Sequence, residues 1–160
     1  MVRWSATVSG AIASGDAILA AQAAGADLAY IGSAFIATNE ANAQEAYKQM
    51  ILESGAEDIV YSNLFTGVHG NYLRGSIERA GLDPLALAQS DPSKMNFNSG
   101  GNVKAWKDVW GAGQGVGAVK RVVPVAELVR RFTEEYALAR RRLDLIGTAG
   151  ASVMRTADIA

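Results

Sequence analysis

The first part of the chain alternates short apolar runs with longer amphipathic segments. Residues 2–8 and 27–32 are rich in apolar and β-branched side chains and predict two strands. Residues 15–24 between them predict a helix, which Ser14 caps and Gly25 ends. So short a connection through a helix favours parallel pairing of the two strands. We therefore expect a β-α-β unit of the kind found in α/β proteins.

The remaining pattern is less regular and predicts more helix than strand. Residues 58–63 predict a short strand, whereas the Gly-, Ser- and Asn-rich stretch 83–101 predicts a loop with one helical turn at 85–88. The longest apolar stripe follows Pro124, which suits the first position of a helix, and the segment after Ile146 predicts a frayed tail. Helices are expected at 40–54, 71–81, 103–110 and from 124 to about 143.

Composition narrows the functional class. The chain has 160 residues, a net charge of −1 and no cysteine. The near-neutral charge argues against nucleic acid and membrane-surface partners, and the lack of cysteine excludes disulfides, thiolate catalysis and cysteine-bound metals. No apolar run approaches the roughly 20 residues that span a bilayer, and the start has no signal-peptide pattern. We therefore expect a soluble cytoplasmic protein, and the sequence leaves homo-oligomer formation open.

The small number of expected parallel strands raises a physical problem. Two or three such strands have unpaired edges and cannot bury their helices, whereas a complete (β/α)8 barrel needs roughly 250 residues. One interpretation is a small open α/β domain with further strands that the pattern does not reveal. The other is that the chain is a piece of a larger barrel.

Both predicted strands end on glycine with serine beside it. The first ends at "SGA" (Ser9, Gly10, Ala11) and the second at Gly32 and Ser33. Ligands of α/β proteins bind beyond the carboxyl ends of parallel strands, and glycine turns leading into helices suit phosphate. Each stop taken alone is better explained by an ordinary turn than by a binding site. Because a single helix separates the two stops, a shared phosphate site becomes an equal alternative.

An ordered series of motifs resembles the nitronate monooxygenases, formerly called 2-nitropropane dioxygenases. The stretch "SGAIASGDAILAAQAAGADLAYIGSAFIATNEA" is similar to their FMN-phosphate segment, which has a Gly-Gly-Ile-Ala turn and a later Gly-Thr. "SNLFTGVHGNYLRGSI" and "WGAGQGVGAVKRVVPVAELVRRF" resemble the Thr-Gly segment and the Ala-Gly-Gln-Gly segment with its final helix. The resemblance extends over residues 7–145 in the order of the family.

This resemblance implies an FMN-binding (β/α)8 TIM barrel that oxidises alkyl nitronates with oxygen to carbonyl compounds and nitrite. Only strands seven and eight, with the C-terminal helical segment, would lie in this chain, so the barrel is incomplete. Residues 1–146 would form the partial barrel and 147–160 a flexible tail. The resemblance implies Ser9, Gly10 and Ala11 as cofactor-binding residues on strand seven, and Gly32 and Ser33 on strand eight. It also implies that Gln114 lies beside the flavin.

The departures from the family pattern concern catalysis. The catalytic histidine of the family comes from an earlier strand, and nothing in this chain matches it. His69 follows strand eight, and we interpret it as a loop residue rather than a substitute. No catalytic residue is therefore assigned, and the isolated chain is expected to be inactive. Two alternatives stay open: a non-catalytic fragment that keeps a phosphate site, and an FMN-dependent enoyl reductase-like barrel.

Other motifs receive structural interpretations. Trp106 and Trp110, four residues apart, predict one buried helix face, and "RRR" at 140–142 predicts a solvated helix surface. "GAGQGVG" follows a predicted helix rather than a strand, which argues against a dinucleotide fingerprint. No metal site is expected, because the spacing of the aspartates does not suit metal ligands and no histidine lies near them. The aspartates in question are Asp83, Asp91 and Asp108.

Overall fold

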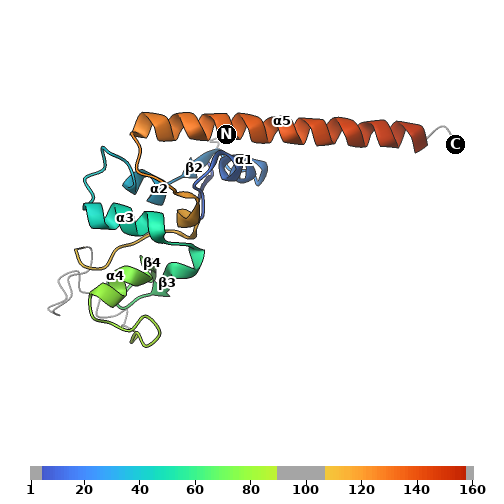
Figure 1. The fold of residues 1–160 in the computed structure, drawn as a ribbon. Coiled ribbons are helices and arrows are strands. Elements are labelled where there is room, and N and C mark those ends of the chain that lie inside the picture. The colour runs from blue at the N-terminus through green and yellow to red at the C-terminus, as the bar shows by residue number, and fades with distance from the viewer. Residues whose placement is uncertain (1–4, 90–106, 158–160) are drawn as a thin grey trace.

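The computed structural model describes residues 5–89 and 107–157, with side chains described up to Leu145. In Figure 1 the long helix α5 (Val125–Ala157) runs past the rest of the molecule, with α1 and β2 close beneath its first half. Helix α3 lies in the middle, and α4 with β3 and β4 lies farthest from α5. The other elements are β1 (Thr7–Ser9), α1 (Gly15–Ala23), β2 (Leu28–Tyr30), α2 (Ser33–Ile36), α3 (Glu45–Glu53), η1 (Ala56–Asp58), β3 (Ile59–Ser62), β4 (Gly70–Leu73), α4 (Arg74–Arg79) and η3 (Gln114–Ala118).

The expected β-α-β unit is present at the start of the chain. Strands β1 and β2 pair in parallel, with Thr7 opposite Leu28, and α1 connects them. The Oγ of Ser14 accepts the N–H of Ala17 at 3.2 Å, as an N-cap does, and Gly25 has the positive φ of +96° that ends many helices. Local signals thus account for this unit, and the chain has an α/β fold.

The helix expected at 40–54 is shorter than predicted and begins at Glu45. The residues before it are engaged elsewhere. Thr38 forms an isolated parallel bridge with Val123, and the Glu40 carboxylate accepts the N–H of Val125 at 2.9 and 3.1 Å. That carboxylate serves the first turn of α5, where backbone N–H groups lack helical partners. Residues 38–40 are therefore held by Val123 and by the first residue of α5, and they are not part of α3.

Two further helix predictions are wrong at their edges. The segment expected to be helical from Asn71 begins as β4, because β3 provides an antiparallel partner, and the helix itself covers only Arg74–Arg79. Residues 107–110 are not helical: the Trp110 N–H donates to Ser76 Oγ at 2.9 Å, and the Trp110 carbonyl accepts from Leu73 at 2.8 Å. Trp110 is buried, as expected, whereas Trp106 lies outside the described residues. A hydrogen-bonded turn, in which the Ala86 N–H donates to the Asp83 carbonyl, overlaps only the start of the helical turn predicted at 85–88.

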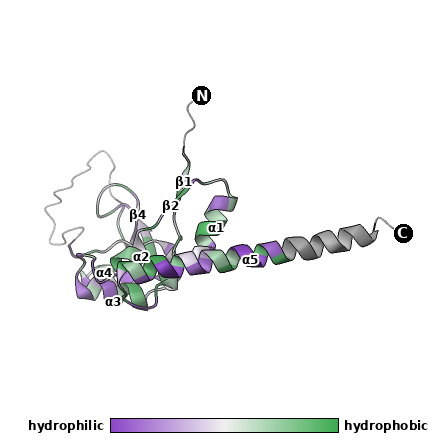
Figure 2. Cartoon of the chain, turned by 90° about the horizontal axis from the view of Figure 1, so that it is seen from above, coloured by the Kyte–Doolittle hydropathy of each residue, from purple (hydrophilic) through white to green (hydrophobic). Residues whose placement is uncertain are grey.

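Helix α5 follows Pro124 and packs only part of its apolar stripe against the molecule. Leu128, Phe132 and Ala139 are buried, whereas Val129 and Leu143 are 47% and 55% exposed. Figure 2 shows hydrophilic and hydrophobic residues interspersed along the coloured part of α5. Its backbone stays helical as far as Ala157, through most of the predicted tail, and the division at residue 146 stays a prediction. Within the described part of the chain, no helix combines the length and apolarity needed to cross a membrane.

Two separate apolar clusters hold the molecule together. The larger one joins α2, α3, η3 and the first half of α5, and it includes the fully buried Ile51, Leu73 and Val116. The smaller one lies around the β3–β4 hairpin and α4 and includes Phe65 and Ile77. Strands β1 and β2 contribute no buried residue to either cluster. The sheet is therefore held mainly by its connections to α1 and by the turns that follow it.

A stack of three side chains lies at the boundary of the larger cluster. The Tyr47 ring stacks on Trp110 at 4.9 Å between centroids, and the Arg79 guanidinium lies 3.7 Å from the centroid of the same indole. The Tyr47 hydroxyl also donates to the Gly111 carbonyl. Tyr47 thereby joins α3 to the segment that leads into η3.

The stack predicts a loss of stability at alkaline pH. Burial raises the pKa of the Tyr47 hydroxyl above its ordinary 10.0. Since the folded state favours the protonated phenol, its contribution is complete below about pH 10 and is lost as pH rises through the folded-state pKa. Urea unfolding between pH 8 and 11 should therefore show a falling free energy of unfolding, with a shallower fall in Tyr47→Phe. The exposed Tyr61→Phe is the control, and an equal slope in both variants would contradict the assignment.

Candidate functional site

The ends of β1 and β2 open into one cavity of about 320 Å³. All five residues that the sequence placed at the two strand ends line it, together with residues from β4 and from the segment before and within η3. Two strand ends and a glycine-rich segment some eighty residues later in the chain thus form the walls of one site. The lining residues are Ser9, Gly10, Ala11, Ile12, Ala13, Tyr30, Gly32, Ser33, Ile36, Asn71, Gly111, Ala112, Gly113 and Gly115.

The turn after β1 has an unusual backbone. Gly10 has φ +105° and Ala11 has φ +54°, a left-handed conformation that non-glycine residues adopt rarely. A Cβ on Gly115 of η3 would lie 2.8 Å from the carbonyl carbon and oxygen of Ala11. The bare glycine thus allows η3 to approach the strained turn directly. The wall of the cavity at this point is backbone, which leaves peptide groups rather than side chains facing the ligand space.

Ser33 joins the two halves of the site. Its Oγ accepts the N–H of Gly113 at 2.8 Å, so the hydroxyl hydrogen is directed elsewhere and can be donated to a ligand. Ser33 is also the first residue of α2, and its own N–H has no partner within that helix. A hydroxyl donor and a peptide donor are therefore available at one strand end.

Gln114 and Asn71 form a polar contact at the edge of the cavity. Gln114, predicted from the sequence, is exposed and is not among the lining residues, but its Oε1 accepts from Asn71 Nδ2 at 3.4 Å. The carbonyl of Asn71 accepts the N–H of Ala112 at 3.2 Å, which holds the glycine-rich segment against β4. Sequence reasoning did not identify Asn71, because its place in the site depends on the unpredicted strand β4.

The cavity offers uncharged hydrogen-bond donors, which suit the binding of an anion. None of its lining residues carries a carboxylate, and none carries a formal positive charge. Peptide N–H groups, the Ser33 hydroxyl and the Asn71 amide are its polar donors, and a phosphate can be bound by such groups without a lysine or arginine. Five of the lining residues are glycines, and a Cβ on Gly10 or Gly32 would meet no atom within 4 Å, so space exists beside the strand ends. The residues present therefore fit the phosphate end of a nucleotide cofactor such as FMN.

The histidine that the sequence analysis considered lies away from this cavity. His69 is exposed, stacks on Tyr61 at 4.8 Å between ring centroids, and does not line the cavity. Within the described ranges, no three histidine, aspartate or glutamate side chains come together in a way that could hold a metal ion. The cavity thus contains groups for binding and orientation, and the described residues place no titratable acid or base among its lining apart from Tyr30.

Similarity to proteins of known structure supports the α/β fold. The chain superposes on nitroalkane oxidase from Streptomyces ansochromogenes with a TM-score of 0.65 and 28% identity, covering 89% of this chain and 42% of that one. It also superposes on FabK from Thermotoga maritima with a TM-score of 0.64 and 20% identity, covering 89% and 47%. At 20% identity, the similarity to FabK concerns the fold alone.

Sequence comparison identifies the family. A nitronate monooxygenase from Paraburkholderia phytofirmans is 29% identical over 141 residues, which are 79% of this chain and 36% of that protein. The chain thus spans little more than a third of the length of this relative. The profile of the family described as "Nitronate monooxygenase" matches residues 7–135, which include both strand ends and the glycine-rich segment that together line the cavity. This chain belongs to the nitronate monooxygenase family.

Proposed function

We propose that this chain forms the cofactor-phosphate part of an FMN-dependent barrel that oxidises alkyl nitronates with oxygen, giving carbonyl compounds and nitrite. The observation that carries the proposal is the shared cavity at the ends of β1 and β2, which is lined by peptide groups and Ser33. Family membership supports a flavin oxidoreductase, and the parallel β1-α1-β2 unit supports a position at strands seven and eight. In this proposal the two strand ends would hold the phosphate, and Gln114 would lie beside the flavin.

The role of this chain is then binding and orientation. When bound, the flavin supplies the transfer of electrons between nitronate and oxygen. The Ser33 hydroxyl and the N–H groups at the Gly10–Ala11 and Gly32–Ser33 turns hold the phosphate, and the Gln114–Asn71 contact supports the neighbouring wall. The described residues offer no base at the cavity, so the isolated chain is expected to show no nitronate-dependent oxygen uptake.

Removing the Ser33 hydroxyl should weaken FMN binding selectively. One hydrogen bond to a charged phosphate contributes about 1.5 kcal/mol, so Ser33→Ala is expected to raise the dissociation constant for FMN about tenfold. Binding of riboflavin, which has no phosphate, should not change. Quenching of flavin fluorescence on titration with the full chain measures both constants.

The matched control is Ser33→Thr, which keeps a hydroxyl at the same position and should bind FMN as the unchanged chain does. Equal affinity of the unchanged chain for FMN and riboflavin would contradict a phosphate site. A test of the substrate class requires the completed protein. Oxygen uptake that depends on a nitronate and is absent with enoyl thioesters supports the nitronate reaction. Activity with enoyl thioesters and none with nitronates supports an enoyl reductase-like barrel.

A further inference from the structure

Helix α3 carries a lysine that points into the interior of the molecule. Lys48 is 6% exposed, and it is the one charged side chain among the buried residues of the described part of the chain. No carboxylate of the described residues forms an ion pair with it. Burying a charge without a counter-charge is unfavourable, and an apolar side chain of similar length would avoid the penalty. Packing alone therefore does not account for a lysine at this position.

A buried hydrogen bond orients this ammonium group toward the end of α2. Lys48 Nζ donates to the Thr38 carbonyl at 2.6 Å. Thr38 Oγ in turn donates to the Phe35 carbonyl within α2 at 2.7 Å. The bond to Thr38 uses one of the three N–H groups of the ammonium, and a carbonyl oxygen carries no formal charge to neutralise it. The positive charge of Lys48 therefore lies next to α2 without a described counter-charge.

The same helix α2 forms part of the wall of the strand-end cavity. Ser33 and Ile36 of α2 line the cavity, and Thr38 follows Ile36 by two residues. Two residues extend over at most about 7 Å, so the carbonyl that accepts from Lys48 lies close behind the wall. The buried ammonium group is thus connected to the cavity through a single short helix.

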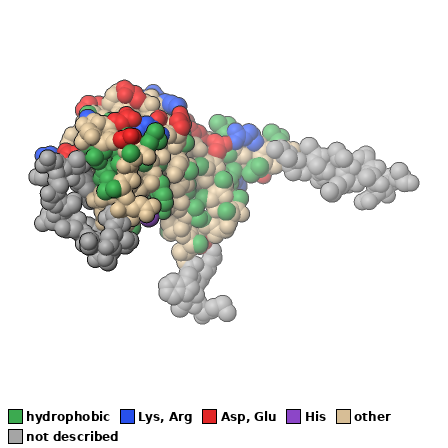
Figure 3. All heavy atoms as spheres, turned by 90° about the horizontal axis from the view of Figure 1, so that it is seen from below, with side chains coloured by type: hydrophobic (Ala, Val, Ile, Leu, Met, Phe, Trp, Pro, Cys, Tyr) green, Lys and Arg blue, Asp and Glu red, His purple; other side chains and the backbone are tan. Residues whose placement is uncertain are grey.

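The charge of Lys48 complements a cavity whose own lining is uncharged. A phosphate ester carries about −1.5 to −2 charges near pH 7. Inside a protein the effective dielectric constant is low, so a buried charge acts over a longer distance and salt screens it little. In Figure 3, by contrast, charged side chains of both signs gather along one rim of the surface, where water and salt screen them. A buried cation behind the wall therefore favours an anion at the strand ends.

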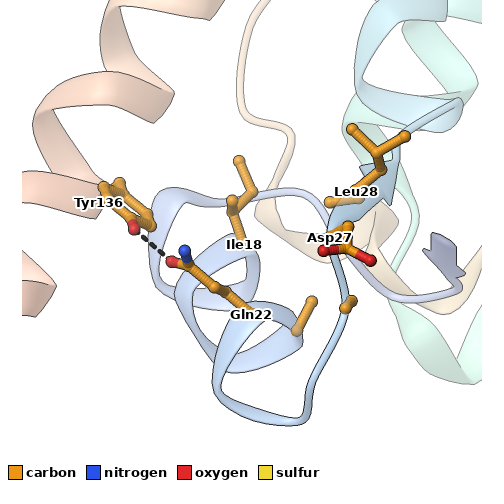
Figure 4. A pocket seen from close by; sticks show the side chains of 8 residues that line it. Ile18, Gln22, Asp27, Leu28 and Tyr136 are labelled. Atoms are coloured by element: carbon orange, nitrogen blue, oxygen red, sulfur yellow. Dashed lines mark hydrogen bonds between the residues drawn. The ribbon is translucent and has the colours of Figure 1, made fainter. Parts of the chain in front are cut away.

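A second cavity of the molecule lacks this combination. It has a volume of about 200 Å³, lies between α1, β2 and α5, and includes Asp27 in its lining. Figure 4 shows the Asp27 carboxylate at this cavity, with the Tyr136 hydroxyl donating to Gln22 Oε1 on another side. Because a carboxylate repels a phosphate, this cavity does not suit the same ligand. Uncharged donors and a nearby buried cation occur together at the strand-end cavity.

We propose that Lys48 is the buried counter-charge of a phosphate bound at the ends of β1 and β2, acting through α2 without contact with the ligand. This inference rests on the proposed function and adds a positioning residue to its phosphate site. A lysine that only anchors Thr38 would, on removal of its ammonium group, lower the stability of the fold and the binding of every ligand. A counter-charge affects only ligands that carry the phosphate.

Lys48→Met removes the charge and keeps an unbranched side chain suited to the interior. We expect the FMN dissociation constant to rise about tenfold and that of riboflavin to stay unchanged, as measured by flavin fluorescence on titration with the full chain. The variant should unfold at the same temperature as the unchanged chain or higher, because an unneutralised buried charge has been removed. Lys48→Arg keeps the charge and should restore the FMN affinity. Lys120→Met, which removes a positive charge from the exposed surface, is the matched control and should alter neither constant.

Inorganic phosphate tests the counter-charge without the flavin ring. At millimolar concentration and constant ionic strength, phosphate should raise the unfolding temperature of the unchanged chain relative to chloride, because a ligand that binds the folded state stabilises it. This rise should be lost in Lys48→Met and kept in Lys48→Arg and Lys120→Met. The measurement is independent of how much of the flavin pocket the chain contains.

The possible results separate this inference from the proposed function. Phosphate-dependent binding of equal strength in Lys48→Met and in the unchanged chain would overturn the counter-charge and leave the proposed function in place. A Lys48→Met protein that unfolds at a lower temperature and binds both flavins less tightly would overturn it in favour of a structural anchor. Equal affinities for FMN and riboflavin, together with a phosphate effect on unfolding that disappears in Lys48→Met, would support the counter-charge and remove the flavin assignment.

Discussion

Gly15→Val is expected to destabilise the protein by about 3 kcal/mol or more, because no side chain fits between α1 and α5. A Cβ on Gly15 would fall on the backbone nitrogen of Tyr136 and the carbonyl oxygen of Phe132, and it would lie 2.6 Å from the Cβ of Glu135. These are backbone and helix-core atoms that cannot rotate away. The two helices would have to separate.

The same contact is held by polar groups that the separation would break. The Gly15 N–H donates to Glu135 Oε2 at 2.8 Å, and the other oxygen of that carboxylate lies 3.4 Å from Arg131 Nε. Arg131 also donates to the Ala13 carbonyl at 3.4 Å, close to the turn that lines the cavity. Losing this network adds to the steric cost, because a partly buried donor then lacks its acceptor.

Urea unfolding followed by circular dichroism at 222 nm measures the effect of Gly15→Val. The control is Gly32→Ala, at a glycine with negative φ where a Cβ would meet no atom within 4 Å, and its stability should stay within about 1 kcal/mol of the unchanged chain. A Gly15→Val protein as stable as the Gly32→Ala protein would show that α1 does not pack on α5 in solution.

Gly115→Ala should have the largest effect on cofactor binding. Its Cβ would lie 2.8 Å from the carbonyl group of Ala11 and 3.1 Å from its Cα, so either η3 or the turn after β1 must move. The turn already has a strained backbone at Ala11 and cannot adapt freely. A displacement of this size at the phosphate site is expected to raise the FMN dissociation constant about 100-fold, more than the loss of the Ser33 hydroxyl.

Gly117→Ala provides the matched control within the same short helix. The nearest atom to its Cβ is the Cα of Gly55 at 3.8 Å, an ordinary contact, so FMN affinity should be unchanged. Thermal unfolding of both variants separates a local effect on the site from a loss of folded protein. Equal FMN affinities for Gly115→Ala and Gly117→Ala would show that the approach of η3 to Ala11 is unimportant for the site.

The elements that the sequence predicted well are those specified by neighbouring residues. Helix α1 has its N-cap at Ser14 and its terminating glycine at Gly25, and both act within a few residues of the helix. Strand β4 was missed because its strand character depends on pairing with β3, although the same residues are compatible with a helix. The segment at 107–110 is not helical for the same reason, since Trp110 is hydrogen-bonded to Leu73 and Ser76.

The candidate site likewise has one part that local sequence predicts and another part that it does not. The glycine and serine stops of β1 and β2 are visible in the sequence because the carboxyl ends of neighbouring parallel strands must lie together. The contact between Ser33 and Gly113 links residues eighty positions apart and has no local signal. Asn71 enters the cavity only through the hairpin. That the two strand ends line one cavity was therefore predictable, but the wall opposite the strand ends was not.

The existence of two apolar clusters has a kinetic consequence for the cavity. Ala13 and Ala112 of the cavity lining belong to the cluster that includes α5, whereas the hairpin carrying Asn71 contributes Leu73 to that cluster and Tyr72 to the other. Regions with separate cores open as separate cooperative units, each with its own free energy. Local opening of β3 and β4 is therefore expected to withdraw Asn71 from the cavity more often than the molecule unfolds as a whole, while the strand ends of β1 and β2 stay in place.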